Sequence, residues 1–187
     1  TLLEILDAVG NGGNGFTIGP GVAGTLIPAI VARSNRGDGV RLQGARATMA
    51  NSIRCGFNNG IGIAIHDVND GNTELESLQL TGNLDAGLLL GGSTRGLKLL
   101  AAIESGAVGL KCQGEGVAGN VVDVTVRGCS GHGAAIEGVR SNRFRIRTAD
   151  CGGNGVLARS TGTNVFDIDA EGNAGDGMRL ERGRNDR

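Results

Sequence analysis

The 187-residue sequence contains no tryptophan or tyrosine, only two prolines and no long apolar segment. A membrane-spanning helix needs about 20 consecutive apolar residues, and no segment approaches that length, so we predict no membrane span. The formal net charge is −1 and both signs are mixed along the chain, which gives no support for nucleic acid as a partner. The scarcity of proline also excludes a collagen-like or polyproline chain.

Glycine is abundant instead, at 36 of 187 residues, while the apolar fraction is an ordinary 39%. Helices tolerate glycine poorly, and a disordered chain would contain fewer apolar residues. The composition therefore indicates many tight turns between short strands, with a thin core of aliphatic side chains.

A unit of 22 to 25 residues recurs along the chain, marked by a small residue, usually polar, four positions before a glycine. The first and third residues after each glycine are apolar, and apolar residues also precede the marker at period two. This alternation predicts a strand with one buried face on each side of the turn. The glycines are Gly15, Gly39, Gly62, Gly87, Gly109, Gly133, Gly155 and Gly177.

Such a unit cannot bury its own apolar face, but copies of it can do so when they stack. We therefore predict an all-β fold, a right-handed parallel β-helix (solenoid) of seven to eight coils. Residues 1–187 are expected to form one such domain. Because no capping helix is apparent at either end, we expect a fragment or repeat region of a longer protein, ends covered by partners, or end-to-end stacking into a filament.

The marker residue recurs at the same corner of each coil, where stacked asparagines can pass hydrogen bonds along the axis. The glycine is expected to supply a conformation, such as positive φ, that other residues resist. The predicted rungs are Asn11, Asn35, Asn58, Asn83, Ser105, Cys129, Cys151 and Asn173. Cys129 and Cys151 lie within disulfide reach, but we favour free thiols because a ladder does not aim one Cβ at the other.

Residues 11–180 carry this pattern, which resembles the right-handed parallel β-helix repeats of the pectate-lyase-like superfamily. Its members include polysaccharide lyases, polygalacturonases, epimerases, phage tailspikes and non-catalytic surface proteins. The resemblance implies a carbohydrate-related role and an extracellular, cell-surface or virion location, and it selects no single activity.

Polygalacturonases of this superfamily use clustered aspartates with Gly-His-Gly and Arg-Ile-Lys motifs, and this chain has GHG at 131–133 and RIR at 145–147. The catalytic candidates are therefore His132, Arg145, Arg147, Asp167 and Asp169. The family's other aspartate motifs have no counterpart here, although glycoside hydrolysis needs two carboxylates flanking one bond. We expect the match to be structural.

Lyases of the superfamily hold Ca²⁺ with acidic side chains, and the densest acidic loop here contains Asp67, Asn69 and Asp70. Its spacing matches no complete calcium loop, so a solvated turn is the simpler interpretation. Two histidines without paired partners do not make a zinc site. No cofactor is therefore expected, with Ca²⁺ as the one alternative.

Opposite charges stack along the later coils, where Arg145 should lie between Asp123 and Asp167, and Arg147 should face Asp169. This face is either a salt-bridge ladder or a surface that binds sugar by hydrogen bonds alone. The ligand-binding candidates are Asp123, Arg127, Arg145, Arg147, Asp167 and Asp169.

The middle coils differ, because the spacing places apolar side chains at outward positions. A contiguous exposed apolar patch often marks an interface, here with a loop, another domain or a symmetry mate in an oligomer. The residues are Leu89, Leu99, Ala101 and Ile103.

Together these patterns favour a non-catalytic structural or glycan-binding module of an extracellular, cell-surface or phage-type protein. The alternatives are a carbohydrate-active enzyme acting on an acidic polysaccharide, and a self-stacking filament subunit.

Overall fold

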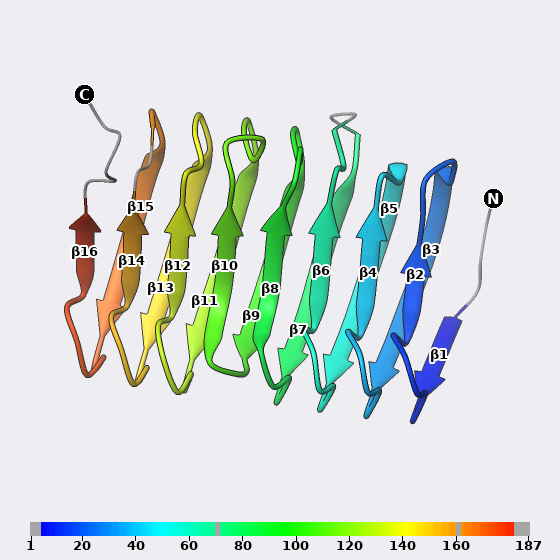
Figure 1. The fold of residues 1–187 in the computed structure, drawn as a ribbon, viewed down its shortest axis with the longest axis horizontal. Coiled ribbons are helices and arrows are strands. Elements are labelled where there is room, and N and C mark those ends of the chain that lie inside the picture. Colours follow the sequence, from blue (N-terminus) through cyan, green and yellow to red (C-terminus); the bar gives the residue numbers. More distant parts are fainter. Residues whose placement is uncertain (1–4, 70–71, 160–161, 182–187) are drawn as a thin grey trace.

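The computed structural model describes residues 5–69, 72–159 and 162–181, and every regular element within them is a β-strand. The strands stack into a right-handed parallel β-solenoid of about seven turns, as predicted (Figure 1). Each coil contributes one strand to each of two eight-stranded sheets. No helix in the described part of the chain is long and apolar enough to cross a membrane.

The odd-numbered strands form sheet A and the even-numbered strands form sheet B, with every pair parallel. Sheet A contains β1 (Ile5–Val9), β3 (Ala23–Arg33), β5 (Arg46–Gly56), β7 (Glu74–Thr81), β9 (Lys98–Glu104), β11 (Val121–Arg127), β13 (Arg143–Ala149) and β15 (Val165–Glu171). Sheet B contains β2 (Phe16–Ile18), β4 (Val40–Gln43), β6 (Ile63–His66), β8 (Ala86–Gly91), β10 (Val108–Gln113), β12 (Ala134–Glu137), β14 (Val156–Arg159) and β16 (Met178–Glu181).

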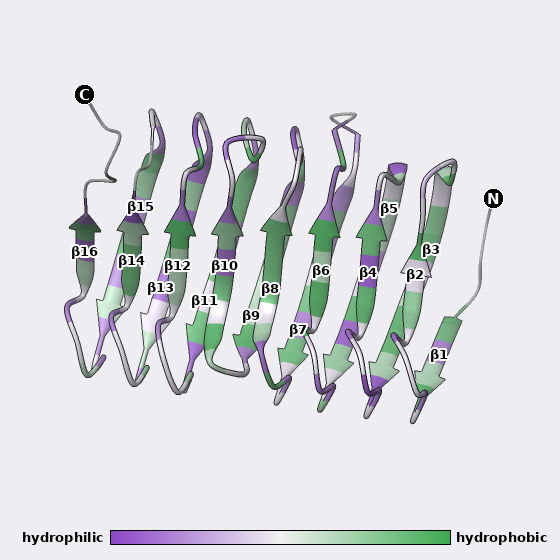
Figure 2. Ribbon diagram, in the orientation of Figure 1, coloured by the Kyte–Doolittle hydropathy of each residue, from purple (hydrophilic) through white to green (hydrophobic). Residues whose placement is uncertain are grey.

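The core is a thin aliphatic layer between the two sheets. Inward residues alternate with outward ones along most strands, so that β13 buries Phe144, Ile146 and Thr148. The Phe144 ring stacks on that of Phe166 in the next coil, with 5.4 Å between ring centroids. Figure 2 shows the apolar residues concentrated along the strands and the polar ones in the turns between them.

The predicted asparagine ladder lies at the corner where the chain passes from sheet A to sheet B, here called the first corner. The Asn35 amide Nδ2 donates to Asn58 Oδ1 at 2.9 Å, and Asn58 Nδ2 donates to Asn83 Oδ1 at 2.8 Å. Asn83 Nδ2 donates in turn to Ser105 Oγ at 3.2 Å. Hydrogen bonding along the axis is therefore confirmed from Asn11 as far as Ser105.

The two cysteines that continue this column are free and buried. The Cys129 thiol donates to the Ser105 carbonyl oxygen at 3.0 Å. Burial and, to a smaller extent, the neighbouring Cys151 thiol together raise the pKa of the Cys129 thiol to about 12. Farther along, the backbone N–H of Cys151 donates to Asn173 Oδ1 at 3.1 Å, so an asparagine ends the column.

The repeated glycine is required for close packing and not for positive φ, so that part of the prediction is wrong. A Cβ on Gly39 would lie 2.6 Å from the Gly62 carbonyl oxygen and 2.9 Å from Asn58 Nδ2. Positive φ occurs instead at the residue just before the ladder, as at Phe57 (φ 55°) and Gly82 (φ 63°). The ladder amide and the next coil together leave no room for a side chain at the glycine.

The coil containing β9 is one residue shorter at the first corner, and this shift overturns the predicted apolar patch. Two residues separate Val126 from Cys129, but only Glu104 separates Ile103 from Ser105. The side chains predicted to face outward therefore belong to the core. Their exposed fractions are 5% for Leu99, 3% for Ala101 and 1% for Ile103.

The fourth residue of that predicted patch, Leu89, belongs to sheet B and not to the sheet that holds β9. It is also buried, in a small cluster with Ile61, Ala64 and Ala86. In β9 it is Leu100, predicted to face inward, that is exposed. An interface built on the four predicted residues therefore has no support.

A second asparagine ladder, not predicted from the sequence, lies at the corner where the chain passes from sheet B back to sheet A, here called the second corner. Asn120 Nδ2 donates to Asn142 Oδ1 at 2.9 Å, and Asn142 Nδ2 donates to Asn164 Oδ1 at 3.1 Å. Each amide also donates to a backbone carbonyl oxygen of the preceding coil, such as that of Thr94. These bonds join the coils of β11, β13 and β15.

Candidate functional site

The outer face of sheet A carries most of the residues predicted to bind ligand. Side chains at alternate positions of its strands point away from the core, which brings equivalent positions of neighbouring coils side by side. Arg145 lies opposite Asp167 in the pairing of β13 with β15, and opposite Asp123 in the pairing with β11. The register predicted for these three coils is therefore confirmed.

Arg145 forms ion pairs with both neighbouring carboxylates. Its Nε lies 2.9 Å from Asp167 Oδ2, and its Nη1 lies 3.7 Å from Asp123 Oδ2. The hydrogen bond to Asp167 raises the pKa of Arg145, and the charges of both carboxylates add to this effect. The side chain of Asp167 is 67% exposed, so water screens this network and its contribution to stability is small.

Arg147 lies opposite Asp169 in the strand register, as predicted, but its ion pair is with Asp123. Its Nη1 lies 3.3 Å from Asp123 Oδ1, a diagonal contact between neighbouring strands. Within the described residues, neither Asp169 nor Arg127 forms an ion pair, so both remain available to a ligand.

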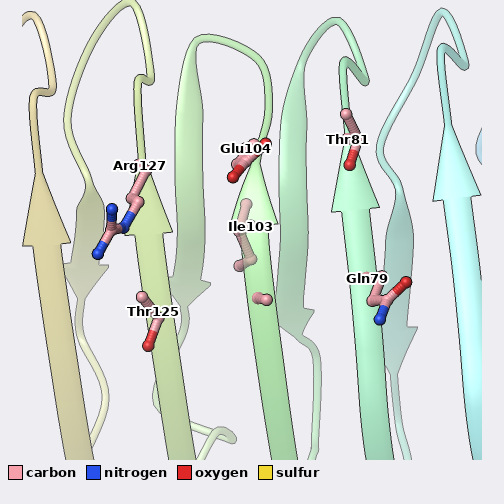
Figure 3. Close-up of a pocket in the computed structure, with 7 residues that line it drawn as sticks. Gln79, Thr81, Ile103, Glu104, Thr125 and Arg127 are labelled. Atoms are coloured by element: carbon pink, nitrogen blue, oxygen red, sulfur yellow. The ribbon is translucent and has the colours of Figure 1, made fainter.

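Four surface hollows lie on this outer face, over strands β7 to β15. The largest, here called the central hollow, has a volume of about 300 Å³ and lies at the ends of β7, β9 and β11 (Figure 3). It is lined by Gln79, Thr81, Ala102, Ile103, Glu104, Thr125 and Arg127. Ala102 lies between the longer side chains of Gln79 and Thr125 on the adjacent strands, which accounts for the depression.

A second hollow, of about 90 Å³, continues from the central hollow along the solenoid axis. Thr125 and Arg127 line both, and the second hollow adds Arg147, Asp169 and Glu171. These two hollows form a polar row at the strand ends that crosses five neighbouring strands of sheet A, from β7 to β15. An elongated ligand lying along the axis would contact several coils at once.

The other two hollows form a second row at the strand starts, with volumes of about 270 and 290 Å³. Val121 lines both of them, so this row also runs along the axis. Its surface combines exposed aliphatic side chains, Leu100 and Val121, with the charged groups of Lys98, Asp123 and Arg145. This row is therefore a mixture of aliphatic and charged groups.

The remaining predicted candidates lie elsewhere and have structural contacts. His132 lies in the turn between β11 and β12, where its Nδ1 accepts the backbone N–H of Asn154 at 3.0 Å. This contact supports a structural reason for the Gly-His-Gly sequence. His132 is thus not part of the outer face that carries Arg145 and Arg147.

The acidic loop proposed for Ca²⁺ has a structural contact too. Asp67 Oδ1 accepts the backbone N–H of Ser93 in the next coil at 2.9 Å. Asp70 lies outside the described residues. Among the residues that are described, no group of three or more histidine, cysteine, aspartate or glutamate side chains is arranged to hold a metal ion.

Most residues of the central hollow were not predicted as site residues, namely Gln79, Thr81, Ala102, Glu104 and Thr125. For Ala102 and Glu104 the cause is the short coil of β9, because counting back from Ser105 places Ala102 in the core. The residues of β7 and β11 follow the regular register, and no motif marked them. A usable signal was present in the sequence. All the remaining coils have two residues between the last inward residue of the sheet A strand and the ladder position, whereas the coil of β9 has only one.

Comparisons of this chain with protein families, with curated proteins and with solved structures find no match. A function for the chain has to be inferred from its own geometry, and the two rows of hollows on sheet A are a surface feature that several coils share.

Proposed function

We propose that this chain is a non-catalytic binding module of the pectate-lyase-like type, which holds a polysaccharide along the outer face of sheet A. The observation that carries the proposal is the alignment of the four hollows in two rows parallel to the solenoid axis. A chain of sugar units is long and regular, and so is this surface. We propose that the module acts outside the cell, at a cell surface or on a phage-type particle.

The chemistry of the rows supports this ligand class. Sugars present many hydroxyl groups, which both donate and accept hydrogen bonds, and the strand-end row offers donors and acceptors of both kinds. Gln79, Thr81 and Thr125 are neutral partners, whereas Glu104 and Arg127 are charged ones. Among the described residues that line the rows, the one aromatic residue, Phe144, has a buried side chain, so polar contacts would dominate binding.

A second candidate, a polysaccharide hydrolase, is favoured by one observation: Asp123 and Asp167 line the same hollow. They lie two coils apart, about 9.5 Å at the usual strand spacing, which falls within the range for inverting glycosidases. However, the guanidinium of Arg145 pairs with both carboxylates. A general acid requires burial or a neighbouring like charge, and Asp167 has an exposed position beside a cation.

The proposal is tested by co-sedimentation of the chain with insoluble polysaccharides, followed by assay of the supernatant for reducing ends and unsaturated sugars. We expect binding without product release. Thr125 lines both hollows of the strand-end row, so Thr125→Trp should fill them and abolish binding there. The control is Ala135→Trp, the same bulk on an outward position of sheet B.

Product release that is lost in Asp167→Asn would replace the binding proposal with the hydrolase. Binding that is reduced equally by both tryptophan variants would place the ligand elsewhere on the solenoid.

A further inference from the structure

Glu104 and Arg127 are neighbours of opposite charge that do not form an ion pair with each other. They follow Ile103 and Val126, which are paired residues of β9 and β11, so the two side chains lie next to each other on the outer face. Opposite charges at such positions usually pair. In the described part of the chain, however, neither side chain forms an ion pair or a hydrogen bond, and both line the central hollow (Figure 3).

The hollow has room for a ligand group because the floor residue is small. Ala102 lies between Gln79 and Thr125 across the sheet, and it is exposed. A longer side chain at this position would fill the floor of the hollow between Gln79 and Thr125, beside Glu104 and Arg127. The same residue is outward only because the coil of β9 is one residue shorter at the first corner.

A carboxylate only accepts hydrogen bonds, and a guanidinium only donates them. Two adjacent hydroxyl groups on a sugar ring satisfy both at once, because one donates to the carboxylate while the other accepts from the guanidinium. A sugar carboxylate would pair with Arg127 but would be repelled by Glu104. The local chemistry therefore selects neighbouring hydroxyls over an acid group.

The strand-end row as a whole carries a small excess of acidic side chains. Three acids, Glu104, Asp169 and Glu171, accompany two bases, Arg127 and Arg147. A polyanion would meet net repulsion along this row, whereas a neutral chain would meet hydrogen-bond partners at each coil.

We infer that the central hollow binds a neutral polysaccharide through two adjacent hydroxyl groups of one sugar unit, held between Glu104 and Arg127. This inference rests on the proposed function and makes its substrate class specific. It differs from the acidic polysaccharide that the superfamily resemblance brought forward for an enzyme.

The test is affinity gel electrophoresis of the whole chain in gels that contain soluble xylan, mannan, mixed-linkage glucan or polygalacturonate. We expect retardation by at least one neutral polymer, with little change when salt is raised. Glu104→Gln and Arg127→Gln should each weaken binding about 10- to 100-fold, the usual effect of losing a hydrogen bond to a charged group. Ala102→Gln should remove binding, whereas the matched control Ala135→Gln on sheet B should not.

Three other outcomes would overturn the inference, alone or together with the binding proposal. Retardation by polygalacturonate alone, with steep salt dependence and no effect of Glu104→Gln, would overturn the neutral-sugar inference and leave the binding proposal intact. Neutral-polymer binding that survives Ala102→Gln would also overturn it. No retardation by any polymer would overturn the binding proposal and the inference together.

Discussion

Both halves of the solenoid have stacked asparagine side chains, but the asparagines lie at different corners in the two halves. In the coils of β1 to β7, asparagines stack at the first corner, while the second corner carries Thr25, Thr48 and Thr73. In the coils of β11 to β15, asparagines stack at the second corner. The first corner carries Cys129 and Cys151 in the coils of β11 and β13, and Asn173 in the coil of β15. Each of these coils thus has an asparagine amide at one corner at least, and the corner differs between the two halves.

The exchange occurs at the coil of β9, which has no asparagine at either corner. Ser105 occupies the first corner and Leu97 the second, and Leu97 donates its backbone N–H to Asn120 Oδ1 at 3.0 Å. This coil is also the one that lost a residue and that holds the floor of the central hollow. The point where the ladders change corner therefore coincides with the main surface irregularity.

The largest expected effect tests the first corner in each half. Asn58→Ala should lower the free energy of unfolding by about 3 kcal/mol or more, because it leaves the buried N–H groups of Asn35 and the carbonyl oxygen of Ala32 without partners. Cys129→Ala at the same corner should cost only about 1 kcal/mol, since a thiol behaves as a small apolar group. Urea unfolding followed by circular dichroism measures both.

Hydrogen exchange provides the control for this pair of variants. Lost protection in Asn58→Ala should be confined to strands β3 to β7, because contacts in a solenoid are made between neighbouring coils. An equal loss of unfolding free energy in the two variants would contradict the conclusion that the first corner depends on asparagine hydrogen bonds only in the early half.

A second, intermediate effect concerns pH and the cysteines that replace asparagine in the later half. Burial raises the pKa of Cys129 to about 12, against about 8.5 for an unfolded cysteine. Above pH 8.5 the unfolded chain loses this proton and the folded chain keeps it, so stability falls as pH rises. The expected loss is about 1.4 kcal/mol per pH unit for each such thiol.

The measurement is urea unfolding between pH 8 and 10, a window in which the absence of tyrosine leaves the thiols as the main titrating groups. Cys129→Ser should flatten the pH dependence by about the amount expected for one thiol. Cys55 and Cys112, whose pKa values burial also raises, account for the slope that remains. An unchanged slope in the variant would show that Cys129 ionises in the folded chain.

The sequence was sufficient for the parallel solenoid and the first corner, because both depend on residues that repeat at one period. It failed at the coil of β9, where one missing residue exchanged the inward and outward faces of the strand. The second ladder was missed because Asn120, Asn142 and Asn164 do not lie at the repeated position four residues before a glycine, but directly before strands. The hollows depend on relative side-chain size across three strands, which no single repeat reveals.

The smallest expected effect tests the second corner of the early half, where threonine stands in for asparagine. The Thr48 hydroxyl is buried and has no hydrogen-bond partner within the described residues. Thr48→Val keeps the shape of the side chain and removes the unsatisfied group, so it should raise the free energy of unfolding by about 1 kcal/mol. Asn142→Ala, at the same corner of the later half, should lower it and provides the contrast in the same urea titrations. Loss of stability in Thr48→Val would show that the hydroxyl has a partner, such as a buried water, and that the second corner is hydrogen-bonded in both halves.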